Sequence, residues 1–68
     1  MKIEIIKKEK KYFVRMTHKS FDYCGGYVDC MIYGAKTEQP YIKYASGYLG
    51  KTYLDDSMKA QLAALKAI

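Results

Sequence analysis

Hydrophobic and polar residues alternate along most of the first two thirds of the chain. In residues 2–8 apolar and polar side chains take turns at the two-residue period of a β-strand, apart from a break at Ile6. In residues 11–17 the same period places Tyr12, Val14 and Met16 on one face, and the polar connection between the two runs is short enough for a hairpin. In residues 27–33 it places Val28, Cys30 and Ile32 on one face, and residues 41–45 form a shorter fourth run. The pattern predicts four strands, the first two of them hairpin-paired.

The period changes to that of a helix from about Tyr53 onward. Apolar residues then recur at spacings of four, four and three: Leu54, Met58, Leu62 and Leu65. Asp55 and Asp56 suit the first turn, where a carboxylate can accept from unpaired backbone N–H groups. We therefore predict an α+β fold: an antiparallel sheet of about four strands in the order ββββα, with the C-terminal amphipathic helix packed on one face. The other face is left to water or to a partner.

Length and composition indicate one compact domain over residues 1–68. Half of the residues are hydrophobic and 28% are charged, which is typical of a globular protein rather than a disordered one. The first eight residues interrupt their apolar positions with charges, and no stretch is long enough to span a membrane. We expect a cytoplasmic protein.

The net charge of +5 is concentrated near the N-terminus. Residues 1–20 contain seven basic and two acidic side chains, whereas residues 21–68 contain five of each. A field of this kind attracts phosphates or an acidic protein surface. The hairpin at 2–17 is therefore a candidate contact region.

Tyrosine is the other unusual component, with eight copies against two phenylalanines and no tryptophan. A domain of this size cannot bury eight such rings, and exposed tyrosines commonly anchor partners. We expect the partner-binding residues to be Lys7, Lys8, Lys10, Lys11, Arg15, Tyr27, Tyr33 and Tyr41.

One segment resembles a known phosphate-binding motif. Residues 45–52, Ala-Ser-Gly-Tyr-Leu-Gly-Lys-Thr, are similar to the phosphate-binding loop of nucleotide hydrolases, although Ala45 stands where that pattern has glycine. That family needs a parallel sheet and a separate acidic magnesium ligand, which 68 residues cannot supply. We favour a glycine turn, with Thr52 or Asp55 capping the helix, and expect no cofactor.

The sequence also contains residues of the kinds that metal-binding and reactive-thiol sites use. His18, Cys24 and Cys30 lack the close pairing that zinc ligands usually show, so we predict no metal site. Free thiols are the default for two cysteines, and a disulfide between them depends on their separation. No arrangement indicates a catalytic nucleophile, and we expect a protein without enzymatic activity.

The function that these features favour is binding. We expect a non-enzymatic interaction protein that docks on a larger protein or nucleoprotein through a tyrosine-rich, basic surface. In size, charge and lack of catalytic machinery it resembles the small inhibitors that phages direct at host machinery, including anti-CRISPR proteins. The alternative is direct binding of single-stranded DNA or RNA, with phosphates on the hairpin lysines and bases on tyrosines. The alanine-rich flank of the helix is also compatible with a homodimer.

Overall fold

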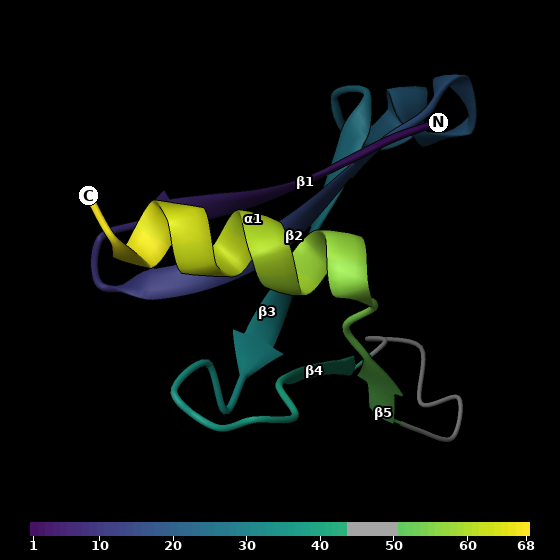
Figure 1. Ribbon diagram of the computed structural model, residues 1–68. Helices are drawn as coiled ribbons and strands as arrows, with labels where there is room; N and C mark the ends of the chain where they lie inside the picture. The colour runs from purple at the N-terminus through teal and green to yellow at the C-terminus, as the bar shows by residue number, and fades with distance from the viewer. Residues whose placement is uncertain (44–50) are drawn as a thin grey trace.

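The computed structural model describes residues 1–43 and 51–68, which form a sheet and one helix (Figure 1). The elements are β1 Lys2–Lys8, β2 Lys11–Thr17, the 3₁₀ helix η1 Lys19–Cys24, β3 Tyr27–Tyr33, β4 Tyr41–Lys43, β5 Lys51–Tyr53 and α1 Asp56–Lys66.

Each strand pairs antiparallel with the next, so the sheet order follows the chain from β1 to β5. The helix α1 crosses one face of the sheet, in front of β1 and β2 in Figure 1. This confirms the predicted antiparallel sheet with one C-terminal helix. The sheet has five strands rather than about four, because β5 lies where the sequence predicted a turn and the start of the helix. Three residues are too few to display a period of two.

The connections explain the strand ends. Glu9, in the two-residue turn between β1 and β2, has a φ of 57°, the left-handed conformation that tight hairpin turns require. The connection between β2 and β3 contains η1, whose first turn is capped by His18 Nδ1 accepting from the Ser20 N–H at 3.1 Å. Gly25 ends η1 with a φ of 83°, a left-handed conformation that favours glycine.

The helix begins three residues later than Tyr53. Asp55 is its N-cap, and its Oδ1 accepts from the Met58 N–H at 2.8 Å. Leu54 N–H donates to the Pro40 carbonyl at 3.1 Å, so the chain continues the β4–β5 ladder up to the residue before the cap. Of the two predicted caps, Asp55 is confirmed, while Thr52 lies inside β5.

The core lies between α1 and the sheet. Val14 is fully buried at its centre, and Leu62 supplies the buried residue of the helix. Gln61 also ties the helix to the sheet edge, because its Oε1 accepts from the Ile5 N–H at 3.1 Å. The buried set draws on every strand except β5: Ile5, Val14, Cys30, Ile32, Ile42, Leu54 and Leu62.

Within the described ranges, no helix has the length and apolar character needed to cross a membrane.

Candidate functional site: the open face of the sheet

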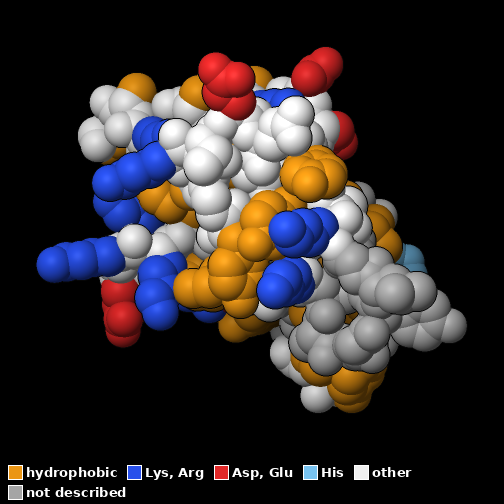
Figure 2. Space-filling model, turned by 90° about the horizontal axis from the view of Figure 1, so that it is seen from below, with side chains coloured by type: hydrophobic (Ala, Val, Ile, Leu, Met, Phe, Trp, Pro, Cys, Tyr) orange, Lys and Arg blue, Asp and Glu red, His pale blue; other side chains and the backbone are white. Residues whose placement is uncertain are grey.

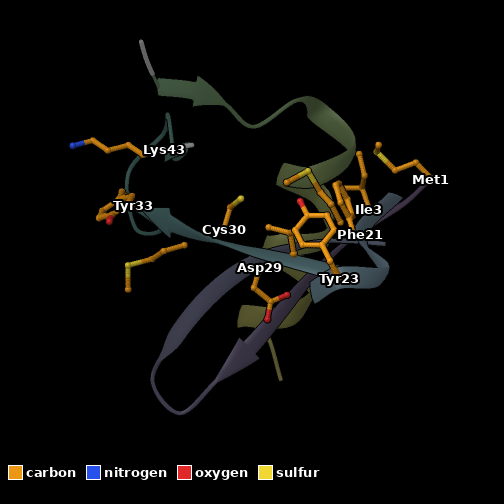
Figure 3. Close-up of a pocket in the computed structure, with 11 residues that line it drawn as sticks. Met1, Ile3, Phe21, Tyr23, Asp29, Cys30, Tyr33 and Lys43 are labelled. Atoms are coloured by element: carbon orange, nitrogen blue, oxygen red, sulfur yellow. The ribbon is translucent and has the colours of Figure 1, made fainter. Parts of the chain in front are cut away.

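The sheet face opposite α1, here called the open face, carries most of the features that the sequence singled out. Alternate side chains of a strand point to opposite faces, so the register assigns each strand residue to one side. Figure 3 shows this directly at Asp29 and Cys30, neighbours in β3 whose side chains leave the strand in opposite directions. Cys30 belongs to the core, whereas Asp29 lies on the open face.

The open face is strongly basic. By register it carries six basic side chains, Lys2, Lys8, Lys11, Arg15, Lys43 and Lys51. Against them stand two acidic ones, Glu4 and Asp29, leaving a surplus of four positive charges out of the chain's net +5. Figure 2 shows basic side chains at the end of the molecule where the β1–β2 turn lies and further ones beside a band of hydrophobic side chains.

Three tyrosines from three neighbouring strands form the tyrosine cluster on this face. Tyr33 pairs with Tyr41, and Tyr41 pairs with Tyr53, so the three side chains lie in one row across β3, β4 and β5. The rings of Tyr33 and Tyr41 are stacked, with centroids 5.5 Å apart and planes 17° from parallel. Tyr53 meets Tyr41 edge to face at 6.1 Å. Tyr33 is 40% exposed and Tyr53 is 54% exposed, so the cluster is open to a partner.

Two lysines cover ring faces within the tyrosine cluster. The Lys43 ammonium lies 5.7 Å from the centroid of Tyr33, and the Lys51 ammonium lies 4.8 Å from that of Tyr41. Both separations fall within the range of a cation–π contact. Lys43 and Lys51 are themselves a cross-strand pair, so their like charges are held side by side. The cluster is therefore a preformed group of rings and cations.

A second group, the arginine cluster, consists of Lys8, Arg15, Tyr27 and Asp29. The Arg15 guanidinium donates two hydrogen bonds to Asp29, from Nε at 2.8 Å and from Nη2 at 3.0 Å. Lys8 Nζ donates to the same carboxylate at 2.5 Å. The guanidinium carbon lies 4.0 Å from the centroid of Tyr27. Asp29 thus fixes both cations and holds Arg15 against a ring.

The contacts between Arg15 and Asp29 lower the pKa of the carboxylate and raise the pKa of the guanidinium. The hydrogen bonds from Arg15 are the main reason that the pKa of Asp29 is lowered, with Lys8 adding to the effect and burial opposing it. The carboxylate in turn raises the pKa of Arg15. Both shifts favour the charged forms, so the Arg15–Asp29 pair is ionised at neutral pH.

The structure places six of the eight predicted partner-binding residues on the open face: Lys8, Lys11, Arg15, Tyr27, Tyr33 and Tyr41. Lys7 does not join them, because it lies on the helix side, where its ammonium is 5.6 Å from the Tyr12 ring centroid. Lys10 lies in the turn, outside the register. These four lysines all lie at or next to the β1–β2 turn, but only Lys8 and Lys11 are placed on the open face by the register.

Sequence reasoning missed Tyr53, Lys43 and Lys51 as members of the site. The predicted strand at 41–45 contained Lys43, but nothing in the sequence assigned this lysine to the binding surface. The number of tyrosines did not distinguish Tyr53 from the other seven. The missing information was that Lys51–Tyr53 is a strand paired with β4.

The remaining candidates are separated or only partly described. Ala45 through Gly50 of the motif that resembles a phosphate-binding loop lies outside the described residues, and Lys51 and Thr52 belong to β5 rather than to a helix N-terminus. Among residues 1–43 and 51–68, no three His, Cys, Asp or Glu side chains are close enough to share a metal ion. Cys24 is exposed and Cys30 is buried, both as free thiols, and burial raises the pKa of Cys30.

A hollow of about 1030 Å³ borders the site. In Figure 3 Tyr33 and Lys43 lie at one end of it and Met1, Ile3 and Phe21 at the other. Its lining is mostly apolar and comes from β1, β2, η1, β3 and β4. The strand β4 pairs with β3 at Ile32 and Tyr33, the last two residues of β3.

Comparison of the chain with protein-family models, with curated proteins and with solved structures finds no match. The fold and the site therefore carry the functional argument.

Proposed function

We propose that this protein is a non-enzymatic interaction module that docks on a larger protein or nucleoprotein through the open face of its sheet. The observation that carries the proposal is the tyrosine cluster: three rings aligned across β3, β4 and β5, with Tyr33 and Tyr53 exposed and Tyr41 half-buried between them, and flanked by Lys43 and Lys51. Tyrosine is among the residues that contribute most binding energy at protein interfaces, because it offers a large rigid surface and a hydroxyl.

Preorganisation supports this function. The rings of Tyr33 and Tyr41 stack on each other, and Arg15 is held against Tyr27 by two bonds to Asp29. Side chains that are already ordered lose less conformational entropy when a partner arrives. A small domain with a fixed contact surface can therefore bind tightly without changing shape.

The same contacts favour a protein surface over unpaired bases as the target. Bases stack on the faces of aromatic rings. On the open face Lys43 and Lys51 lie over the rings of Tyr33 and Tyr41, and Arg15 lies over Tyr27. A base would have to displace these cations, whereas a protein surface can use the ring edges and hydroxyls as they stand.

Such a module acts by occupying space on its partner. We propose an inhibitor of the kind that covers a functional surface or the nucleic-acid path of a host nucleoprotein enzyme. The surplus of four positive charges on the open face would guide it toward acidic or phosphate-bearing surfaces.

Capture from an extract of the cells in which the protein acts, with and without nuclease, tests the proposal. Tyr41→Ala and Tyr53→Ala remove cluster rings, and Tyr23→Ala is the matched control, because Tyr23 is 81% exposed but lies in η1. Loss of a central tyrosine typically costs about 2 kcal/mol or more of binding free energy, so we expect retention of a captured partner to fall roughly 30-fold in the cluster variants.

The proposal fails if the Tyr23 variant and the cluster variants capture the same partner equally well. Circular dichroism of each variant separates loss of binding from loss of folding. Capture that disappears with nuclease and is replaced by direct, salt-sensitive binding of oligonucleotides would instead support the nucleic-acid alternative.

A further inference from the structure

We infer that the tyrosine cluster and its two lysines recognise a carboxylate-bearing protein segment, laid across β3, β4 and β5. The inference rests on the proposed function and names the chemistry of the partner. Its basis is charge complementarity, together with the hydrogen bonds that this face already makes to the carboxylate of Asp29.

The open face itself shows how it binds a carboxylate. Asp29 receives two hydrogen bonds from Arg15 and one from Lys8, and Tyr27 backs the guanidinium. This arrangement of two cations, one ring and one carboxylate is complete within the arginine cluster.

The tyrosine cluster repeats the cations and the rings but contains no acidic residue. Lys43 and Lys51 face each other across β4 and β5, and the next residues on the same face of these two strands are Tyr41 and Tyr53. The only acidic residues that the register places on the open face are Glu4, on β1, and Asp29, on β3. Within the described strands, the positive charge of this end of the sheet is therefore available to an external anion.

The ring geometry selects carboxylates over nucleotides as that anion. Side chains in a strand stand roughly perpendicular to the sheet, which places tyrosine hydroxyls at the outer surface as donors. A carboxylate can accept from these hydroxyls while pairing with the lysines, and charge-assisted bonds of this kind are stronger than neutral ones. A nucleotide would gain the lysine contacts but would lose base stacking, because cations already lie over Tyr33 and Tyr41.

The spacing suits an extended or helical segment. Strands in a sheet are about 4.8 Å apart, so the three tyrosines span roughly 10 Å across β3, β4 and β5. Two acidic side chains on one face of a helix, three or four residues apart, lie about 5–6 Å from each other and match a pair of neighbouring strands.

Titration of the ¹⁵N-labelled protein with short poly-L-glutamate, and separately with oligothymidylate of equal formal charge at the same salt, tests the inference. We expect polyglutamate to shift the amide signals of Tyr33, Tyr41, Lys43 and Tyr53 and to bind more tightly than the oligonucleotide. The double variant Lys43→Glu/Lys51→Glu should weaken polyglutamate binding by roughly tenfold or more, because two attractive charges become repulsive.

Two matched variants complete the design. Lys19→Glu/Lys59→Glu makes the same change of charge on η1 and α1 and should retain most of the binding, because neither residue lies on the open face. Lys43→Arg/Lys51→Arg keeps the charge and should preserve binding.

The inference is overturned if oligothymidylate binds more tightly than polyglutamate, if polyglutamate shifts signals elsewhere, or if both double charge reversals weaken binding equally. Each of these results leaves docking through tyrosines standing, provided that capture of a partner still depends on Tyr41 and Tyr53. If capture is also insensitive to those tyrosines, the proposed function fails as well.

Discussion

Replacing Asp29 by asparagine tests the arginine cluster as a source of stability. Asp29 accepts from Arg15 at 2.8 and 3.0 Å and from Lys8 at 2.5 Å, with only 14% of its side chain exposed. Asparagine keeps the shape and one acceptor but loses the charge that both cations share. Exposed ion pairs contribute about 0.2–1 kcal/mol, whereas hydrogen bonds to charged groups contribute about 1.5–3 kcal/mol. For this half-buried site we expect a loss of about 1–2 kcal/mol.

Thermal and urea denaturation followed by circular dichroism measures this loss. In a domain of this size, it corresponds to a fall in melting temperature of roughly 5–15 °C. Glu4→Gln is the matched control on the same face, because Glu4 approaches its partner Lys2 only to 4.0 Å and both side chains are substantially exposed. We expect the control to change stability by less than about 0.5 kcal/mol.

The pH dependence has a definite sign. The pKa of Asp29 is lower in the folded protein than in the unfolded chain, so the unfolded chain takes up the proton first as the pH falls. The stability that Asp29 contributes is present above its unfolded pKa of about 4 and is lost as the pH falls through the folded value. The difference between the wild type and Asp29→Asn should therefore shrink in acid. An equal difference at neutral and strongly acidic pH, or no difference at either, would show that the charge of Asp29 does not stabilise the fold.

Three further outcomes follow from the core and its edges. Leu62→Ala should cost about 2–5 kcal/mol in urea denaturation, because Leu62 is 4% exposed and is the buried residue of α1. Gln61→Ala should cost about 1 kcal/mol and should accelerate hydrogen exchange of the Ile5 amide, because its acceptor is removed. Under native conditions a thiol reagent should modify exposed Cys24 rapidly and buried Cys30 only on unfolding, since burial also raises the pKa of Cys30 and disfavours its thiolate.

Each of these outcomes has its own control. Ala64→Ser, at an exposed position of α1, should leave stability within about 0.5 kcal/mol of the wild type. Gln61→Glu keeps an acceptor and should preserve protection of the Ile5 amide; equal exchange in all three proteins would show that the bond is not formed in solution. Cys24→Ser should abolish the rapid thiol reaction, and persistence of that reaction would contradict the burial of Cys30.

Alternation along the chain located the long strands well. β1, β2 and β3 each have seven residues and begin and end where the pattern predicted. Over seven residues, a period of two is unmistakable, and charged or glycine-containing turns bound each run. The helix was also predictable from its apolar stripe and from its cap at Asp55. The helical period starts in the sequence at about Tyr53, three residues before the helix begins, because Tyr53 and Leu54 fit a helical pattern as well as a strand.

The site was predictable only in part. The charge excess and the tyrosine count pointed to a binding surface, and Arg15, Tyr27, Tyr33 and Tyr41 lie on it. Lys7 lies on the opposite face from Lys8, because adjacent residues of a strand point to opposite sides of the sheet.

The class of fold, the face of each strand that carries the core and the basic, tyrosine-rich character of the chain follow from the sequence alone, because they depend on local periodicity and composition. Which tyrosines meet depends on how the strands pair in three dimensions. Tyr33, Tyr41 and Tyr53 are far apart along the chain, and they share a row because β5 pairs with β4 in one register. A shift of one residue would turn Tyr53 to the other face. That choice of register depends on long-range pairing energy, which no local pattern in a three-residue strand can reveal.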